Sequence, residues 1–108
     1  MSVLLWQPVV GHNCTYDLMF LYSHFEGALP ASLQEFKRAL ATLLPEVWDT
    51  KYLSTMSGKY ADTMLSKLYD TCRAVLPRPV TFAPGYETYA SGGQCHDAGY
   101  DACELLGL

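Results

Sequence analysis

The pattern of apolar and polar positions near the start of the chain predicts a strand followed directly by a helix. The apolar segment there predicts a short strand over Pro8–Gly11, because Pro8 lacks the N–H group that a longer ladder would need. Apolar residues then recur at helical spacing over Thr15–Phe25, with Asn13 available as the helix cap.

A second helix and a second strand are predicted next. Ser32 and Glu35 form a capping box at the start of a helix that runs to about Leu44 and is ended by Pro45. Residues 46–51 are short, apolar and flanked by helix breakers, which is typical of a brief strand. Because a helical crossover joins the two strands, we expect them to be parallel.

The second half of the chain is predicted to be mostly helical. Residues 61–76 show one apolar face, residues 77–93 predict a surface loop with an extended piece at 80–82, and the last helix runs over about 97–106. Two short strands with about four helices indicate an α/β fold. A two-stranded sheet leaves both edges unpaired, so we expect something to pair with it.

Length, composition and charge limit the protein classes. A chain of 108 residues fits one domain, and 50% hydrophobic with 17% charged residues is typical of a compact core. A net charge of −4 and a pI of about 5.1 argue against a broad basic RNA-binding surface, so any nucleic-acid contact must be local. The excess of acidic residues is expected if carboxylates cluster around divalent cations, but it is also ordinary for a globular protein.

The cysteines and the N-terminus indicate the cellular setting. No Cys-x-x-Cys spacing and no paired histidines at zinc-ligand intervals occur, so we expect buried free thiols at Cys14, Cys72, Cys95 and Cys103. No signal-peptide features are present, and no apolar run approaches the roughly 20 residues of a membrane span. A reducing cytosolic or nuclear setting is expected.

Asp17 is the first candidate for chemistry. It falls in the first turn of a predicted helix, just after the Gly11-His12-Asn13 end of a strand. In open α/β folds, ligands gather at the carboxyl ends of the strands, so this carboxylate could face an active-site crevice. The alternative is an acid that merely complements the helix dipole.

His96 and Asp101 are the other two candidates. On one regular helix their spacing would set them about 140° apart, because each residue advances roughly 100°. We therefore expect His96 in the loop before the helix, where Gly99 keeps the first turn slim. A histidine there can act as a general base near neutral pH. The alternatives are a capping or surface histidine at His96 and a solvated helix acid at Asp101.

Four motifs follow one another between about residues 8 and 103: Val-Val-Gly-His-Asn-x-x-x-Asp-Leu-Met, Leu-Pro-x-Ser-Leu-x-x-Phe-Lys, Trp-Asp-Thr-Lys-Tyr and His-x-Ala-Gly-Tyr-Asp-Ala. In their order and gaps they resemble the poly(A)-specific ribonuclease family, the deadenylase-like branch of the DEDDh 3′→5′ exonucleases. The tyrosine after Asp49-Thr-Lys51 leans towards the nuclear relatives that trim the 3′ tails of small RNAs.

The resemblance implies a ribonuclease H-like fold, RNA with a free 3′ hydroxyl as substrate, with poly(A) tails foremost, and two Mg²⁺ (or Mn²⁺) ions. By position, Asp17 corresponds to the acid of the second exonuclease motif, Asp101 to that of the third, and His96 to the general base. Both aspartates would then be metal ligands. Two-metal hydrolysis needs several such carboxylates, because hard cations select oxygen ligands.

One family motif is missing. Relatives carry an Asp-x-Glu pair on the first strand of the sheet, and none occurs in these 108 residues. We therefore expect a single partial ribonuclease H-like domain over 1–108 without its central first strands, which would come from upstream sequence or a partner chain. Asp49 could serve as a substitute ligand, but its counterpart in the family is structural.

Three further expectations follow. The chain alone should be inactive or nearly so and bind at most one cation weakly. An apolar sheet edge that includes Val9 and Val10 should promote association with itself or with a partner chain. The alternatives to a nuclease segment are a degenerate, non-catalytic nuclease module for RNA or protein contact, and an unrelated small α/β binding domain.

Overall fold

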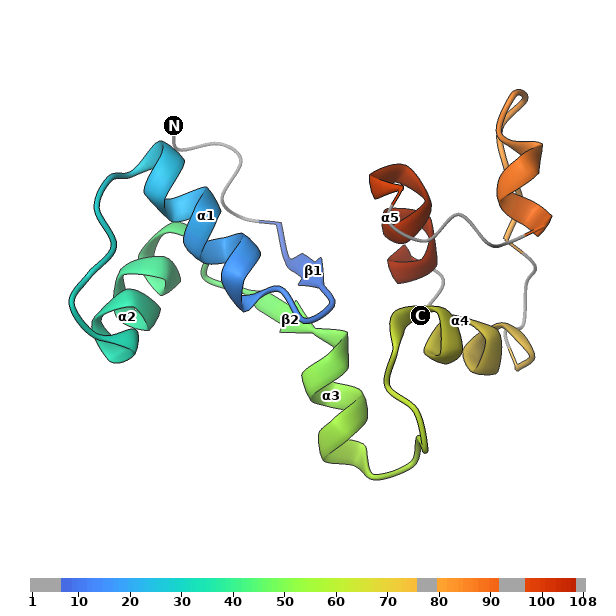
Figure 1. The fold of residues 1–108 in the computed structure, drawn as a ribbon, viewed down its shortest axis with the longest axis horizontal. Coiled ribbons are helices and arrows are strands. Elements are labelled where there is room, and N and C mark those ends of the chain that lie inside the picture. The colour runs from blue at the N-terminus through green and yellow to red at the C-terminus, as the bar shows by residue number, and fades with distance from the viewer. Residues whose placement is uncertain (1–6, 76–79, 92–96, 107–108) are drawn as a thin grey trace. The chain divides into compact units, whose positions relative to one another are not determined.

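The computed structural model describes residues 7–75, 80–91 and 97–106. In chain order the elements are β1 (Val9–Gly11), α1 (Thr15–Phe25), α2 (Leu33–Leu43), β2 (Val47–Asp49), α3 (Thr50–Ser57), α4 (Leu65–Arg73), the 3₁₀ helix η1 (Glu87–Ser91) and α5 (Ala98–Leu106) (Figure 1). The two strands pair in parallel, with Val9 opposite Val47 and Gly11 opposite Asp49. The predicted α/β class and the parallel pairing are confirmed.

The chain divides into two compact units, Met1–Tyr52 and Leu53–Leu108, and the division falls inside α3. The first unit holds both strands together with α1 and α2, and the second holds α4, η1 and α5. The expectation of a single domain over residues 1–108 stays a prediction.

In the first unit, α1 and α2 contact each other through an aromatic pair. The rings of Tyr22 and Phe36 meet edge to face with centroids 5.6 Å apart, and Phe36 is buried. The predicted capping box at the start of α2 is present: the Ser32 side chain accepts a hydrogen bond from Glu35 N, and the Glu35 side chain accepts one from Ser32 N. The helix start therefore forms as its local sequence predicts.

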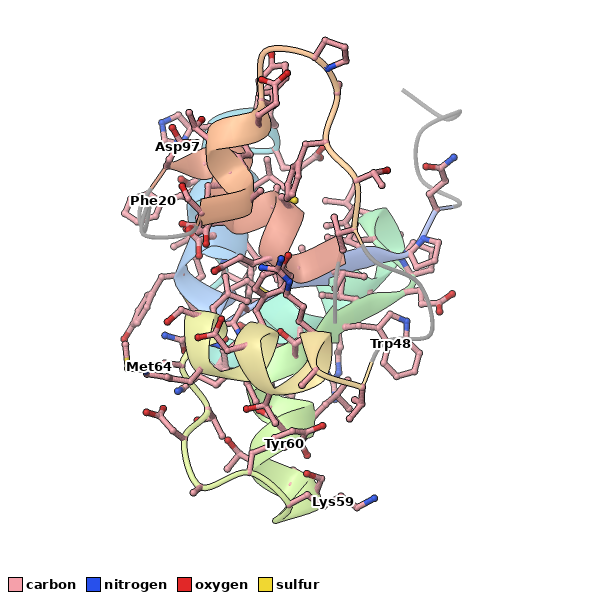
Figure 2. The ribbon with its side chains drawn as sticks, turned by 90° about the vertical axis from the view of Figure 1, so that its right-hand side faces the viewer. Phe20, Trp48, Lys59, Tyr60, Met64 and Asp97 are labelled. Carbon is pink, nitrogen blue, oxygen red and sulfur yellow. The ribbon has the colours of Figure 1, made fainter. Side chains whose placement is uncertain are left out.

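Much of the apolar surface of the first unit is uncovered. Helix α1 has no buried residue, and Val10 of β1 is 49% exposed. The indole of Trp48 projects away from β2, where its Nε1 donates to Glu46 Oε1 at 2.7 Å (Figure 2). Other large exposed apolar side chains of this unit are Tyr16, Phe20, Leu21, Phe25, Leu29, Leu33 and Tyr52. Where such exposed apolar side chains adjoin one another, they are typical of a surface that another segment or chain covers.

The second unit has the larger buried core. Helices α4 and α5 pack together, and Leu68, Tyr69 and Tyr100 are buried. The Arg73 guanidinium lies over the Tyr69 ring, 5.9 Å from its centroid.

Three elements differ from the sequence prediction. Helix α3 occupies Thr50–Ser57, of which Thr50 and Lys51 were expected in the second strand and the rest had no predicted element. Helix α4 begins at Leu65 and not near 61, because Met64 is extended and its N–H bonds to Asp62 Oδ1 at 2.9 Å. Residues 80–82 form no strand, and η1 lies within the expected loop.

The cysteines and the helix lengths can also be compared with the sequence predictions. The described cysteines Cys14, Cys72 and Cys103 are free, as predicted, but only half-buried, while Cys95 lies outside the described residues. Among the described helices, none has the length and apolar character needed to cross a bilayer.

Candidate functional site

Asp17 lies where the sequence predicts it. It is an exposed residue in the first turn of α1, and α1 begins directly after the turn that follows β1. The carboxylate therefore stands beyond the carboxyl end of a parallel strand, the place where α/β folds collect ligands. Its role as a metal ligand stays a prediction.

The turn between β1 and α1 is tight. Asn13 adopts the left-handed region with φ 54°, which asparagine tolerates better than most residues. A Cβ atom added to Gly11 would lie 2.6 Å from Cys14 Sγ and 2.7 Å from Cys14 Cβ. Glycine is thus required at this position because the Cys14 side chain approaches the Gly11 backbone closely.

The predicted cap of α1 is wrong. Cys14, and not Asn13, occupies the N-cap position, and its side chain does not cap the N–H groups of α1. The carboxylate of Asp49, at the end of β2, accepts the N–H groups that precede the helix: Oδ1 accepts from Asn13 N and Oδ2 from Cys14 N, both at 3.0 Å. A residue distant in sequence replaces the local cap because the parallel register sets Gly11 opposite Asp49.

The same carboxylate also caps α3. Oδ1 of Asp49 accepts from Lys51 N at 2.9 Å and from Tyr52 N at 3.3 Å, which is the usual geometry of an aspartate at a helix N-cap. The structural role that the family resemblance implies for Asp49 is therefore confirmed. The sequence contains the signal for α3, since an aspartate directly before Thr50 is a favourable cap.

A second contact joins the same two segments. Nδ1 of His12 lies 2.9 Å from Thr50 Oγ1, and Thr50 Oγ1 donates to Gly11 O at 3.2 Å. Because the hydroxyl has one hydrogen and gives it to the carbonyl, it accepts from His12, so the imidazole carries its proton on Nδ1. The Gly-His-Asn and Asp-Thr-Lys motifs thus form one hydrogen-bonded structure.

The electrostatics of this turn affect two groups. Burial, together with the negative charge of Asp49 and the hydrogen bond to it, raises the pKa of the Cys14 thiol to about 11. Partial burial opposes ionisation of Asp49, but the N–H groups of Cys14, Asn13 and Tyr52 outweigh it and lower the pKa of the carboxyl group. Near neutral pH, Asp49 is ionised and Cys14 is a neutral thiol of low reactivity.

In the second unit, Asp101 lies in the first turn of α5 and is half-buried. The residue before this helix, Asp97, acts as its cap: its Oδ1 accepts from Tyr100 N at 3.0 Å, and its carbonyl accepts from Asp101 N at 2.9 Å (Figure 2). The predicted start of the last helix is confirmed to within one residue. Asp101 as a metal ligand stays a prediction.

A tyrosine from η1 supports the cap of α5. Tyr89 donates its hydroxyl to Asp97 Oδ1 at 3.0 Å, and its ring meets Tyr100 edge to face with centroids 5.5 Å apart. A Cβ atom on Gly99 would lie 2.9 Å from the Tyr89 hydroxyl oxygen. The glycine expected to keep the first turn slim thus makes room for this tyrosine, and no local sequence signal marked Tyr89.

A buried carboxyl group lies one turn beyond Asp101. Glu104 is 3% exposed. Burial raises its pKa, the hydrogen bond from Tyr100 opposes that rise, and the negative charges of Asp101 and Asp70 add to it. The sequence showed Glu104 only as one more polar residue, because its burial depends on α4 packing against α5.

The described residues do not assemble a complete cation site. Over residues 7–75, 80–91 and 97–106 there is no group of three or more histidine, cysteine, aspartate or glutamate side chains that could hold a metal ion. Asp17 belongs to the first unit and Asp101 to the second, and His96 lies outside the described residues. Each described candidate is a single carboxylate on the first turn of a helix.

An α/β arrangement with a parallel strand pair, and an acid beyond the end of β1, agrees with part of a ribonuclease H-like domain. The profile of the CAF1 family of ribonucleases matches residues 5–104. The chain belongs to the CAF1 ribonuclease family. This membership excludes the unrelated α/β binding domain considered from the sequence.

Individual relatives agree with this assignment. The chain is 39% identical over 100 residues to poly(A)-specific ribonuclease PARN of Danio rerio, an alignment that covers 87% of this chain and 15% of that protein. It is 37% identical over 71 residues to the pre-piRNA 3′-exonuclease trimmer of Bombyx mori, covering 59% of this chain and 13% of that protein. It is 30% identical over 112 residues to poly(A)-specific ribonuclease PNLDC1 of Homo sapiens, covering 94% and 22%.

The alignments thus span between 13% and 22% of the lengths of these relatives. No solved structure matches the chain.

Proposed function

We propose that this chain is a segment of a 3′→5′ exoribonuclease that shortens poly(A) or other 3′ tails of RNA. The observation that supports this most is the position of Asp17, on the first turn of α1 at the carboxyl end of β1, in a chain of the CAF1 ribonuclease family. The names of the relatives, poly(A)-specific ribonucleases and a pre-piRNA 3′-exonuclease, indicate the substrate class.

The proposed roles of the residues follow from their chemistry. Asp17 and Asp101 each provide carboxylate oxygens to divalent cations, and His96 takes the proton from the attacking water. When bound, a pair of Mg²⁺ or Mn²⁺ ions supplies charge stabilisation for the attacking and leaving oxygens of the phosphate. The RNA makes local contacts around these residues, since the net charge is −4.

Under this proposal, the nuclease activity depends on carboxylates that lie outside these 108 residues. The described part of the chain gathers no set of three metal-ligating side chains, and no Asp-x-Glu pair occurs in the 108 residues. These residues alone therefore do not fit a two-cation site, and we expect the isolated chain to be inactive or nearly so. The missing carboxylates would come from a longer product of the same gene or from a partner chain.

The uncovered apolar surface favours such a partnership. Val10, Trp48 and Phe20 are exposed in the first unit, and β1 pairs with β2 alone among the described residues. A strand added beside β1, or self-association of the chain, would cover this surface. RNA tails are shortened in the nucleus or the cytoplasm, and we place the protein in one of these compartments.

The missing motif also favours a second function. A member of a nuclease family without the Asp-x-Glu pair could be a non-catalytic module that contacts RNA or another protein. Catalysis and binding give different results with the same RNA.

The test uses a 5′-labelled oligoadenylate with a free 3′ hydroxyl, and the same RNA blocked by a 3′ phosphate as its control. The chain is assayed with Mg²⁺, alone and together with a segment that supplies an Asp-x-Glu strand. We expect no shortening by the chain alone and Mg²⁺-dependent shortening of the unblocked RNA by the completed protein. Asp17→Asn and Asp101→Asn should abolish this activity, whereas Asp62→Asn, an exposed aspartate, should retain it. A completed protein that binds the RNA without shortening it would establish the non-catalytic alternative.

A further inference from the structure

We propose that Asp49 is the positioning residue for Asp17: its carboxylate fixes the turn before α1 and thereby the place of that helix's first turn. The inference rests on the proposed function, because the place of Asp17 matters to catalysis only if Asp17 holds a cation. Asp49 itself would touch neither the cation nor the RNA.

Both carboxylate oxygens of Asp49 are occupied by hydrogen-bond donors of the protein. Oδ1 accepts the N–H groups of Asn13, Lys51 and Tyr52 at 2.9 to 3.3 Å. Oδ2 accepts Cys14 N at 3.0 Å and faces Cys14 Sγ at 3.5 Å. A carboxylate that accepts this many backbone donors has little capacity left to ligate a cation.

The turn before α1 needs a support from outside its own sequence. Asn13 has a positive φ, a conformation that costs energy for any residue with a side chain, and the side chain of Cys14 at the N-cap accepts no N–H group of α1. The two N–H groups of this turn, those of Asn13 and Cys14, are both held by Asp49. Without that acceptor, the backbone before α1 loses the contact that keeps it in this conformation.

Only a few bonded contacts separate Asp49 from Asp17. Asp49 is fixed by its register opposite Gly11 and by its position at the start of α3. Cys14, held through its N–H, accepts Leu18 N through its carbonyl at 2.9 Å, and this bond closes the helical turn that contains Asp17. A displacement of Cys14 would therefore be transmitted directly to the Asp17 carboxylate.

The inference predicts that asparagine cannot replace Asp49 although it has the same shape. In either orientation, the amide NH₂ group that Asp49→Asn introduces would face a backbone N–H: that of Cys14, or those of Asn13, Lys51 and Tyr52. Asp62 is the matched control, because it accepts one described N–H, that of Met64, through a single oxygen. Asp62→Asn can keep that bond.

The experiment is NMR of the isotope-labelled full chain, with two readouts. The first is the strong intraresidue HN–Hα NOE of Asn13, which reports its positive φ. The second is the broadening of amides near Asp17 by added Mn²⁺, which reports where the cation sits. Wild type is compared with Asp49→Asn, Asp17→Asn and Asp62→Asn, and unchanged α4 and α5 resonances show that the second unit stays folded.

We expect Asp49→Asn to remove the positive-φ signature of Asn13 and the Mn²⁺ broadening together. Asp17→Asn should remove the broadening alone, and Asp62→Asn neither. If Asp49→Asn abolishes the broadening while Asn13 keeps its signature, Asp49 is a ligand and the inference is overturned. If wild type shows no broadening, this chain alone holds no cation at Asp17, and the Asn13 signature alone still decides the positioning role.

A measurement on wild type needs no variant to fold. As the pH is lowered, the amides of Asn13, Cys14, Lys51 and Tyr52 should shift together with one apparent pKa, below the ordinary aspartate value of 3.8. Separate titrations of these amides, or none, would contradict a shared acceptor.

Discussion

The two candidate metal ligands are held in place in different ways. Asp17 depends on a long-range contact, since the carboxylate of Asp49 reaches the turn before α1 from 36 and 35 residues away. Asp101 depends on a local one, since Asp97 caps α5 directly and Tyr89 joins it from eight residues away. The position of Asp17 therefore depends on the pairing register of the two strands. The position of Asp101 depends on residues close to it in the sequence.

The contrast extends to the cores. The first unit has Phe36 as its buried hydrophobic residue among those described, whereas the second has Leu68, Tyr69 and Tyr100. Few buried apolar contacts make a region open more easily. We therefore expect the position of Asp17 to be more sensitive to mutation and to missing partners than that of Asp101.

The largest expected effect is that of Gly11→Ala. The new Cβ would lie 2.6 Å from Cys14 Sγ and 2.7 Å from Cys14 Cβ, which cannot move without shifting the turn. We expect the first unit to lose about 3 kcal/mol of stability. Both tryptophans of the sequence precede Leu53, where the second unit begins, so denaturant unfolding followed by tryptophan fluorescence measures the first unit. A loss below about 1 kcal/mol would show that the turn is not tightly built.

The next effect concerns Glu104 and pH. Burial raises the pKa of this carboxyl group above its ordinary value of 4.5, so the folded state binds the proton more tightly than the unfolded state. The second unit should therefore gain stability as the pH falls through the raised pKa, with the full gain reached below 4.5. Glu104→Gln should add about 1 kcal/mol at pH 7 and remove this pH dependence, as measured by amide exchange of α5. An unchanged pH profile in the variant would assign the dependence to other groups.

The pH dependence of stability that Asp49 contributes is opposite to that of Glu104. The pKa of its carboxyl group is lowered on folding, so its contribution to stability is present above the ordinary value of 3.8 and is lost as the pH falls through the lowered value. Mild acid should consequently stabilise the second unit before stronger acid destabilises the first. Tryptophan fluorescence and α5 amide exchange, measured on the same samples, separate the two responses.

The smallest effects are expected at the cap of α5. Gly99→Ala brings a Cβ to 2.9 Å from the Tyr89 hydroxyl oxygen, which lies at the end of a side chain that can move away. Tyr89→Phe removes the bond to Asp97 without adding atoms. Both should speed amide exchange of Tyr100 and Asp101 severalfold while leaving α4 unaffected. If Gly99→Ala destabilised the second unit as much as Gly11→Ala destabilises the first, the two helix starts would be equally intolerant of an added Cβ, contrary to this expectation.

The sequence predicted those elements whose signals are local. The span Thr15–Phe25 of α1, the capping box of α2 and the start of the last helix are confirmed, because each depends on neighbouring residues. The parallel pairing was also predictable, since a helical connection between two short strands leaves few alternatives.

The features that the sequence did not predict depend on contacts between distant segments. Asn13 was expected as a cap because its type suits that role, yet Asp49 provides the acceptor through the strand register. Helix α3 is the exception: it was missed for a local reason, because Thr50–Ser57 is rich in serine and threonine, which have weak helix propensity, although Asp49 directly before it is a favourable cap. The contacts of Tyr89 and the burial of Glu104 could not be predicted either, because both depend on how α5 packs.

The number of cations that the full chain binds, and how tightly, shows whether it holds a complete metal site or only part of one. We propose that Asp17 and Asp101 are two ligands of a cation site that this chain completes only with further carboxylates. Isothermal titration of the full chain with Mn²⁺ should show at most one weakly bound ion, and none when both aspartates are replaced by asparagine. Tight binding of two ions by the isolated chain, or binding that survives the loss of both aspartates, would contradict this proposal.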